Sequence, residues 1–137
     1  MKYIARDQTE RFQSLLRSFP ALLIVGPRQC GKSTLARRTL PDWTHLDLER
    51  PADLAVLAAD LEGFFDAHPH SVVIDEAQRL PELFSFLRYA IDRTPKKGRF
   101  LLLGSASPTL TRSISETLAG RVALLELTPF LASELTG

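Results

Sequence analysis

Residues Gly26 to Ser33 read GPRQCGKS, a complete G-x-x-x-x-G-K-[ST] loop. An apolar run (21–25) precedes the loop and a helix-compatible segment (34–38) follows it, which is the context that a phosphate-binding loop requires. A glycine-rich loop can wrap a polyphosphate with backbone N–H groups, and the next helix directs its positive end at the same charges. The pattern predicts a nucleoside triphosphate site. The alternative is a glycine-rich turn that happens to contain lysine and serine.

Two side chains of this loop have distinct expected roles. Lys32 would reach the β- and γ-phosphates, and the hydroxyl of Ser33 would join the coordination shell of Mg²⁺. Cys30 fills a variable loop position, where an inert side chain is favoured over a reactive thiol. The residues predicted to bind the nucleotide are Gly26, Pro27, Arg28, Gln29, Cys30, Gly31, Lys32, Ser33 and Thr34.

A second pattern, SVVIDE at residues 71–76, is a short β-branched strand that ends in two adjacent carboxylates. Ligands of parallel sheets lie at the carboxyl ends of the strands. Asp75 is therefore a candidate metal residue, holding Mg²⁺ through water. Glu76 is a candidate catalytic residue that polarises a water for attack on the γ-phosphate. The alternative left open is that the pair caps a helix beginning at Pro81 or faces solvent.

A third apolar run, residues 100–103, ends in GSASP. In P-loop ATPases with an additional strand between the P-loop strand and the acidic strand, a polar residue here touches the γ-phosphate or the attacking water. Ser105 is the first candidate for this role and Ser107 the second. A turn before a helix, with Ser107 or Thr109 as its cap, explains the same residues equally well.

Helices and strands alternate along the chain. Helical spacing predicts helices at residues 7–19, 34–38, 51–65 with a break near Gly63, 81–91 and 109–118. Apolar runs predict strands at residues 21–25, 71–76, 100–103 and 122–127, and period-two alternation predicts a strand nearer the sheet edge at residues 43–48. This alternation predicts an α/β fold, a three-layer P-loop NTPase with a parallel five-stranded sheet.

Composition agrees with one intracellular domain. The chain has 137 residues, 45% of them hydrophobic, and its single cysteine cannot form an internal disulfide. With 17 basic and 16 acidic residues, the chain lacks the strong excess of positive charge that is typical of nucleic-acid-binding proteins. The basic clusters at residues 37–38 and 96–99 are expected to be exposed to solvent at a helix end or turn. The N-terminus is polar and no apolar run approaches the length of a membrane span, so we expect a cytoplasmic protein.

Arg121 follows a helix stop and precedes a predicted strand. Its planar, permanently charged fork suits stabilisation of charge on a transferring phosphoryl group. The alternative is a pair with a surface carboxylate such as Glu116. The three histidines, His45, His68 and His70, lack the spacing of zinc ligands.

Five sequence blocks occur in an order that is more specific than any one of them: YIARD, SFPALLIVGPRQCGKSTL, VVIDEAQRLPELFSFLR, FLLLGSAS and ETLAGRVALLELTPF. Together, from about residue 3 to residue 135, they resemble the ATP-binding domain of prokaryotic AAA-type ATPases that carry a C-terminal domain of unknown function. The resemblance implies an additional-strand fold of strand order 5-1-4-3-2. It also implies that Lys32 and Ser33 take the Walker A position and that Asp75 and Glu76 take the Walker B position.

The resemblance further implies a first-sensor position for Ser105, and it matches Arg121 to the family's Ala-Gly-Arg element, with a phosphate-sensing or finger role. Ser105 stands where many related ATPases have Asn or Thr, and this chain contains no Asn. Family members are also longer. We therefore expect residues 1–137 to be a single AAA-type core without the C-terminal lid and partner domain, as a fragment, a natural truncation or a shortened paralogue.

The sequence favours Mg²⁺-dependent ATP binding and hydrolysis, with ATP and Mg²⁺ as cofactors. The alternative is an ATP-binding regulatory switch with little or no turnover. A GTPase would generally need an Asn-Lys-x-Asp motif, which a chain without asparagine cannot contain. A small-molecule kinase would normally lack the second carboxylate, Glu76. We expect a nucleotide partner, a homo-oligomer as one option, no membrane, and an unknown protein partner bound through the missing C-terminal region.

Overall fold

The computed structural model describes residues 2–27, 31–105 and 107–127 of the chain. Within them, five strands form one sheet of order β2-β3-β4-β1-β5, and every neighbouring pair is parallel. The strands are β1 (Ala21–Gly26), β2 (Thr44–Asp47), β3 (Val72–Asp75), β4 (Phe100–Ser105) and β5 (Val122–Glu126). The predicted parallel sheet is confirmed, and so is the predicted order 5-1-4-3-2, which is the same order counted from the other edge.

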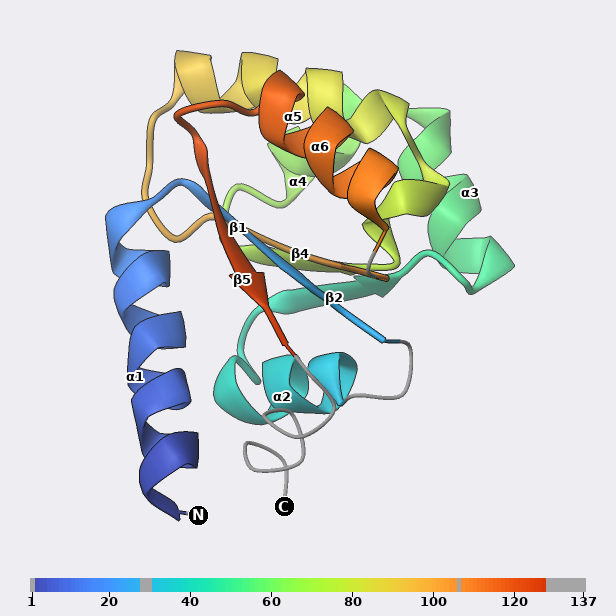
Figure 1. Cartoon of the computed structure of the whole chain (residues 1–137). Coiled ribbons are helices and arrows are strands. Elements are labelled where there is room, and N and C mark those ends of the chain that lie inside the picture. The colour runs from blue at the N-terminus through green and yellow to red at the C-terminus, as the bar shows by residue number, and fades with distance from the viewer. Residues whose placement is uncertain (1, 28–30, 106, 128–137) are drawn as a thin grey trace.

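Helices cover both faces of this sheet, so the predicted three-layer architecture is also confirmed (Figure 1). The helices are α1 (Lys2–Ser18), α2 (Lys32–Thr39), α3 (Pro51–Ala59), α4 (Leu61–Ala67), the 3-10 helix η1 (Ala77–Arg79), α5 (Glu82–Arg93) and α6 (Pro108–Thr117). In Figure 1, α1 and α2 lie on one face and α3 to α6 on the other. No helix in the described residues is long and apolar enough to cross a membrane.

The inner strand β1, between β4 and β5, is buried along its whole length because both of its faces are covered. Leu22 and Ile24 face the layer of α1 and α2, where they join Phe12 of α1. Leu23 and Val25 join the core under the other helices. This explains why β1 reads as an unbroken apolar run rather than an alternating one.

The helical segment predicted over residues 51–65 with a break near Gly63 is two helices, and the break lies three residues earlier, at Asp60. The chain leaves helical geometry at Asp60 (φ −161°, ψ 89°), whose carboxylate accepts a hydrogen bond of 2.9 Å from the backbone N–H of Gly63. Aspartate is a strong N-cap, so it begins a new helix inside an apolar pattern that looked continuous. Gly63 lies within α4, where an added Cβ would come within 2.2 Å of Asp60 Oδ2.

Candidate nucleotide site

The pairing register decides which residues share the carboxyl edge of the sheet. Gly26, the last residue of β1, pairs with Ser105, the last residue of β4. At the same edge, Asp47 of β2 pairs with Asp75 of β3. The structure therefore brings the start of the glycine-rich loop, the acidic pair and Ser105 to one edge.

The described part of the loop shows how α2 begins. Gly31 has φ 87° and ψ 17°, a left-handed conformation that glycine adopts without steric penalty, and it is the N-cap of α2. The first helical residue, Lys32, is only 3% exposed. Its Nζ donates hydrogen bonds to the carbonyl oxygens of Gly26 (2.9 Å) and Pro27 (2.8 Å). A positive charge is thus held against the loop, at the end of a helix where unpaired N–H groups favour anions.

Three of the predicted nucleotide-binding residues, Arg28, Gln29 and Cys30, lie outside the described residues. Thr34, also predicted, is exposed on the first turn of α2.

Ser33 and Asp75 meet between α2 and β3. The Ser33 hydroxyl donates a short hydrogen bond to Asp75 Oδ2. Burial raises the pKa of Asp75, and the negative charges of Asp47 and Glu76 raise it further, whereas the hydrogen bond from Ser33 opposes the shift. The sequence reasoning missed Asp47. Its signal was a carboxylate near the end of an alternating strand, which becomes informative only once β2 is known to pair with β3.

Glu76 has an unusual backbone. Its φ of 55° is the one positive φ at a non-glycine residue in the described part of the chain. Left-handed geometry is disfavoured for such residues and often marks a functional site. The side chain is buried, at 8% exposure, and its Oε2 accepts a hydrogen bond of 2.5 Å from Gln78 Nε2. Glu76 therefore does not face solvent, and no side chain caps the start of α5, so the capping alternative is wrong as well.

The residues around Ser33 and Asp75 fit one side of a Mg²⁺ shell. No group of three or more histidine, cysteine or acidic residues in the described chain is arranged to hold a metal by itself. Mg²⁺ bound with a nucleotide needs fewer protein ligands, because phosphate oxygens and waters supply most of its coordination shell. A hydroxyl and a carboxylate already in contact match this requirement.

The two serines after β4 take different positions. Ser105 is half-buried, directly across from Gly26. Ser107 precedes α6, and its carbonyl oxygen accepts the 2.8 Å bond from Thr111 N–H that opens the helix. The helix-start interpretation therefore fits Ser107, and Thr109 lies inside α6. Of these two serines, only Ser105 lies at the carboxyl edge of the sheet beside the loop.

Arg121 lies at the opposite edge of the sheet. Its carbonyl oxygen accepts a bond of 3.3 Å from the N–H of Ala21, the first residue of β1. Its guanidinium donates to Asp92 through Nε (2.7 Å) and Nη2 (2.9 Å), and to the carbonyl oxygen of Ala119 (2.8 Å). A surface carboxylate is thus the partner, but it is Asp92 and not Glu116. The hydrogen bond from Arg121 lowers the pKa of Asp92. The length of β1, about 16–20 Å, separates Arg121 from the loop.

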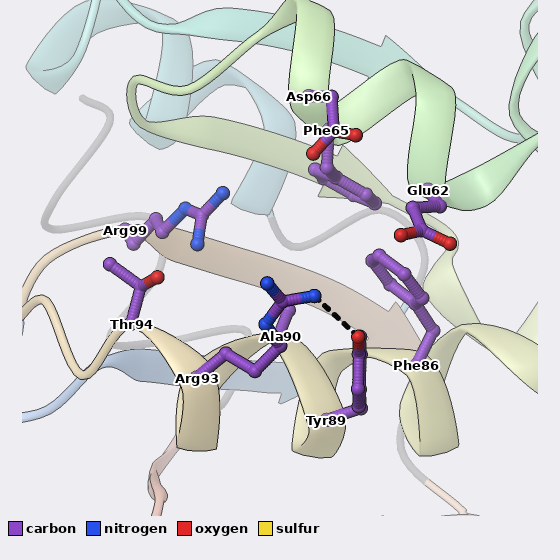
Figure 2. Close-up of a pocket in the computed structure, with 9 residues that line it drawn as sticks. All are labelled: Glu62, Phe65, Asp66, Phe86, Tyr89, Ala90, Arg93, Thr94 and Arg99. Atoms are coloured by element: carbon purple, nitrogen blue, oxygen red, sulfur yellow. Dashed lines mark hydrogen bonds between the residues drawn. The ribbon is translucent and has the colours of Figure 1, made fainter.

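A second hollow, of about 250 Å³, lies between α4 and α5 (Figure 2). The rings of Phe65 and Phe86 stack in it at 5.4 Å, and Arg93 Nη1 donates a 2.5 Å hydrogen bond to the hydroxyl of Tyr89. Arg99, which also lines the hollow, precedes β4, so the hollow lies toward the amino ends of the strands. It is separate from the loop at the carboxyl edge.

A five-stranded parallel sheet of this order, with a glycine-rich loop between the inner strand β1 and the helix α2, defines the fold class of P-loop nucleoside triphosphatases. Within that class, the chain belongs to the AAA_14 family of AAA domains, whose family model matches residues 18–136. Membership of this family indicates a P-loop ATPase-like, nucleotide-binding function.

Two curated relatives are uncharacterized proteins of Mycobacterium bovis and Mycobacterium tuberculosis. Each is 45% identical to this chain over 125 residues, which cover 89% of this chain and 28% of the relative. The chain thus spans little more than a quarter of the length of these relatives.

Proposed function

We propose that this chain binds ATP with Mg²⁺ and hydrolyses the bond between the β- and γ-phosphates. The observation that carries the proposal is a grouping at one edge of the sheet. It consists of the Lys32 ammonium, the hydrogen-bonded pair of Ser33 and Asp75, and the Glu76 carboxylate. Phosphoryl transfer to water requires little covalent chemistry from a protein. It needs cations on the phosphates and a group that orients the attacking water, and this grouping contains both kinds of group.

Binding would begin at the loop and the first turn of α2. The N–H groups there have no acceptor within the helix and favour phosphate oxygens. Lys32 would exchange the carbonyl oxygens of Gly26 and Pro27 for oxygens of the β- and γ-phosphates. Ser33 and Asp75 would hold Mg²⁺, which when bound neutralises charge on the phosphates.

Glu76 would act on the attacking water. Its carboxylate takes a proton as the water oxygen forms a bond to the γ-phosphorus, and the bond from that phosphorus to the β,γ-bridging oxygen breaks. The products are ADP and inorganic phosphate, and Glu76 then returns the proton to solvent. Ser105, across from Gly26, would contact the γ-phosphate or this water.

Arg121 would act only on a nucleotide that is bound by a second copy of the chain. It lies one strand length from the loop of its own chain, so it would reach a γ-phosphate held by a neighbour in a homo-oligomer. The 137 residues would act as one core, and the process coupled to ATP would depend on a partner protein.

Three proteins test the hydrolysis: the wild type, Glu76→Gln and Lys32→Ala. We expect Glu76→Gln to bind Mg²⁺-ATP as the wild type does but to release phosphate at least about 100-fold more slowly. Lys32→Ala should weaken binding itself. Lys97→Ala, which removes an exposed lysine, is the matched control and should behave as the wild type. Equal phosphate release by the wild type and Glu76→Gln would overturn hydrolysis and leave an ATP-binding switch as the function.

A further inference from the structure

Gln78 lies two residues after Glu76, in the 3-10 helix η1, which packs against β4. The sequence reasoning assigned it no role. Its amide nitrogen donates the hydrogen bond of 2.5 Å to Glu76 Oε2. A buried carboxylate needs hydrogen-bond donors in place of the water that it has lost, and Gln78 supplies one.

The other end of the same amide lies against β4. A Cβ added to Gly104 would come within 3.1 Å of Gln78 Oε1, the one atom within 4 Å of that position among the described residues other than the two chain neighbours of Gly104. Gly104 is not among the glycines with positive φ, so its backbone does not require glycine. The Gln78 amide would have to shift by a few tenths of an ångström to admit a Cβ here, so its present position favours a glycine.

Glu76 and Gly104 each follow a paired residue on neighbouring strands. Asp75, the last residue of β3, pairs with Leu103 of β4, and Glu76 comes next after Asp75 as Gly104 comes next after Leu103. The Gln78 amide spans these two residues. Its Oε1 is buried and has no hydrogen-bond partner among the described residues, so this oxygen is held by packing alone.

We propose that Gln78 is a positioning residue that fixes the Glu76 carboxylate, and that Gly104 is the notch on β4 into which the Gln78 amide fits. The inference rests on the proposed role of Glu76 in hydrolysis. Glu76 stands in a strained left-handed conformation on a short turn, and the amide stops its carboxylate from rotating away from the sheet edge. Gln78 acts through Glu76 and does not itself take part in proton transfer.

The first measurement compares steady-state phosphate release from Mg²⁺-ATP by the wild type and Gln78→Ala. We expect kcat to fall about 10- to 100-fold, because a misplaced base loses rate. KM for ATP should stay within about twofold, since the proposed binding steps use Lys32, Ser33 and Asp75 and not Gln78. Gln13→Ala removes an exposed glutamine of α1 and is the matched control, with unchanged kcat. A general loss of folding would instead lower the melting temperature and the active fraction.

The second measurement is a double-mutant cycle with Gly104→Ala. In the wild-type background the added methyl group pushes on the Gln78 amide, and kcat should fall severalfold. In the Gln78→Ala background the methyl group meets nothing, so Gly104→Ala should cause no further loss. If the two losses in kcat were fully additive, the proposal that Gly104 makes room for the Gln78 amide would be overturned.

Failure of this inference can be told apart from failure of the proposed hydrolysis. If Glu76→Gln abolishes turnover but Gln78→Ala keeps the wild-type kcat, only the role of Gln78 is overturned. If the wild type releases phosphate no faster than Glu76→Gln, the hydrolysis itself is overturned, and the positioning role with it. Support requires the loss in kcat, the constant KM and the non-additive cycle together.

Discussion

A hydrogen bond from the Ser33 hydroxyl to the Asp75 carboxylate joins the start of α2 to the end of β3, across 42 positions of sequence. It brings together the two groups that we propose to hold Mg²⁺, the hydroxyl directly and the carboxylate through water. The charged form of the same carboxylate is disfavoured in the folded protein. It is partly buried and close to Asp47 and Glu76, which together raise its pKa. The ionised carboxylate therefore suits a divalent cation, but it destabilises the folded protein when no cation is bound.

Asp75→Asn should stabilise the protein in the absence of Mg²⁺ and nucleotide. The pKa of Asp75 is raised in the folded state, so the folded protein binds more protons than the unfolded chain between the ordinary and the raised value. The free energy of unfolding of the wild type therefore falls as the pH rises through this interval, and the destabilisation is complete above the raised pKa. Asparagine carries no charge and can still accept the hydrogen bond from Ser33. We expect its melting temperature to exceed that of the wild type by on the order of 2 °C at neutral pH.

Thermal unfolding measured across pH checks this expectation. The difference between Asp75→Asn and the wild type should shrink toward zero as the pH falls to about 4, the ordinary value for an aspartate. Asp42→Asn, at an exposed position, is the control and should show no such pH-dependent gain. A melting temperature below that of the wild type at every pH would contradict the electrostatic explanation.

Ser33→Ala should weaken nucleotide binding only when Mg²⁺ is present. The hydroxyl is a proposed ligand of the ion, whereas the loop N–H groups and Lys32 contact phosphate without it. We expect affinity for Mg²⁺-ATP to fall about tenfold and affinity for ATP in a chelator to change by less than about twofold. Titration calorimetry under both conditions measures the two affinities. Ser85→Ala, at an exposed position of α5, is the control, and an equal loss with and without Mg²⁺ would remove Ser33 from the metal shell.

The sequence predicted β1, β3 and β4 well because they are apolar runs that are buried along most of their length. The edge strands β2 and β5 carry a weaker signal, because β2 is only partly buried and β5 alternates buried with exposed residues. It also predicted the residues at the carboxyl edge, since a parallel sheet collects the ends of its strands there. Ser105 illustrates this success: its position across from Gly26 follows from strand order.

The parts that could not be predicted depend on contacts between distant segments or on local hydrogen bonds. Asp92 is 29 positions from Arg121, so sequence spacing favoured the nearer Glu116 as its partner. Gln78 looks like an ordinary polar residue until η1 packs against β4. Asp60 was hidden in an apolar helical pattern, where its capping bond to Gly63 decided the helix boundary.

The cap at Asp60 predicts a stability effect that is separate from the nucleotide site. Asp60→Ala removes the acceptor for the Gly63 N–H and should lower the free energy of unfolding by about 1 kcal/mol. Chemical denaturation measures this change, and the affinity for Mg²⁺-ATP should stay the same. Asp42→Ala, which removes an exposed aspartate outside any helix, is the matched control. An equal loss in both variants would mean that the capping bond contributes nothing beyond the charge.

Arg121 predicts an effect that depends on protein concentration. Its guanidinium is bound to Asp92 at the edge opposite the loop, so it cannot assist hydrolysis in its own chain. If copies of the chain assemble with Arg121 facing a neighbour's nucleotide, Arg121→Ala should lower kcat at least about tenfold at concentrations where the wild type assembles. At concentrations where the wild type is monomeric, the two proteins should release phosphate equally. The melting temperature should change by less than about 2 °C, because exposed ion pairs contribute little to stability.

Mixing two impaired variants tests the action between copies directly. Glu76→Gln keeps Arg121 but lacks the proposed base, whereas Arg121→Ala keeps the base but lacks the arginine. In a mixed assembly, Arg121 of the first variant can serve the intact site of the second, so phosphate release should rise above the sum of the separate rates. Arg11→Ala, which removes an exposed arginine of α1, should behave as the wild type at every concentration. A loss in Arg121→Ala that is the same at all concentrations, with no recovery on mixing, would mean that the pair with Asp92 has a structural role alone.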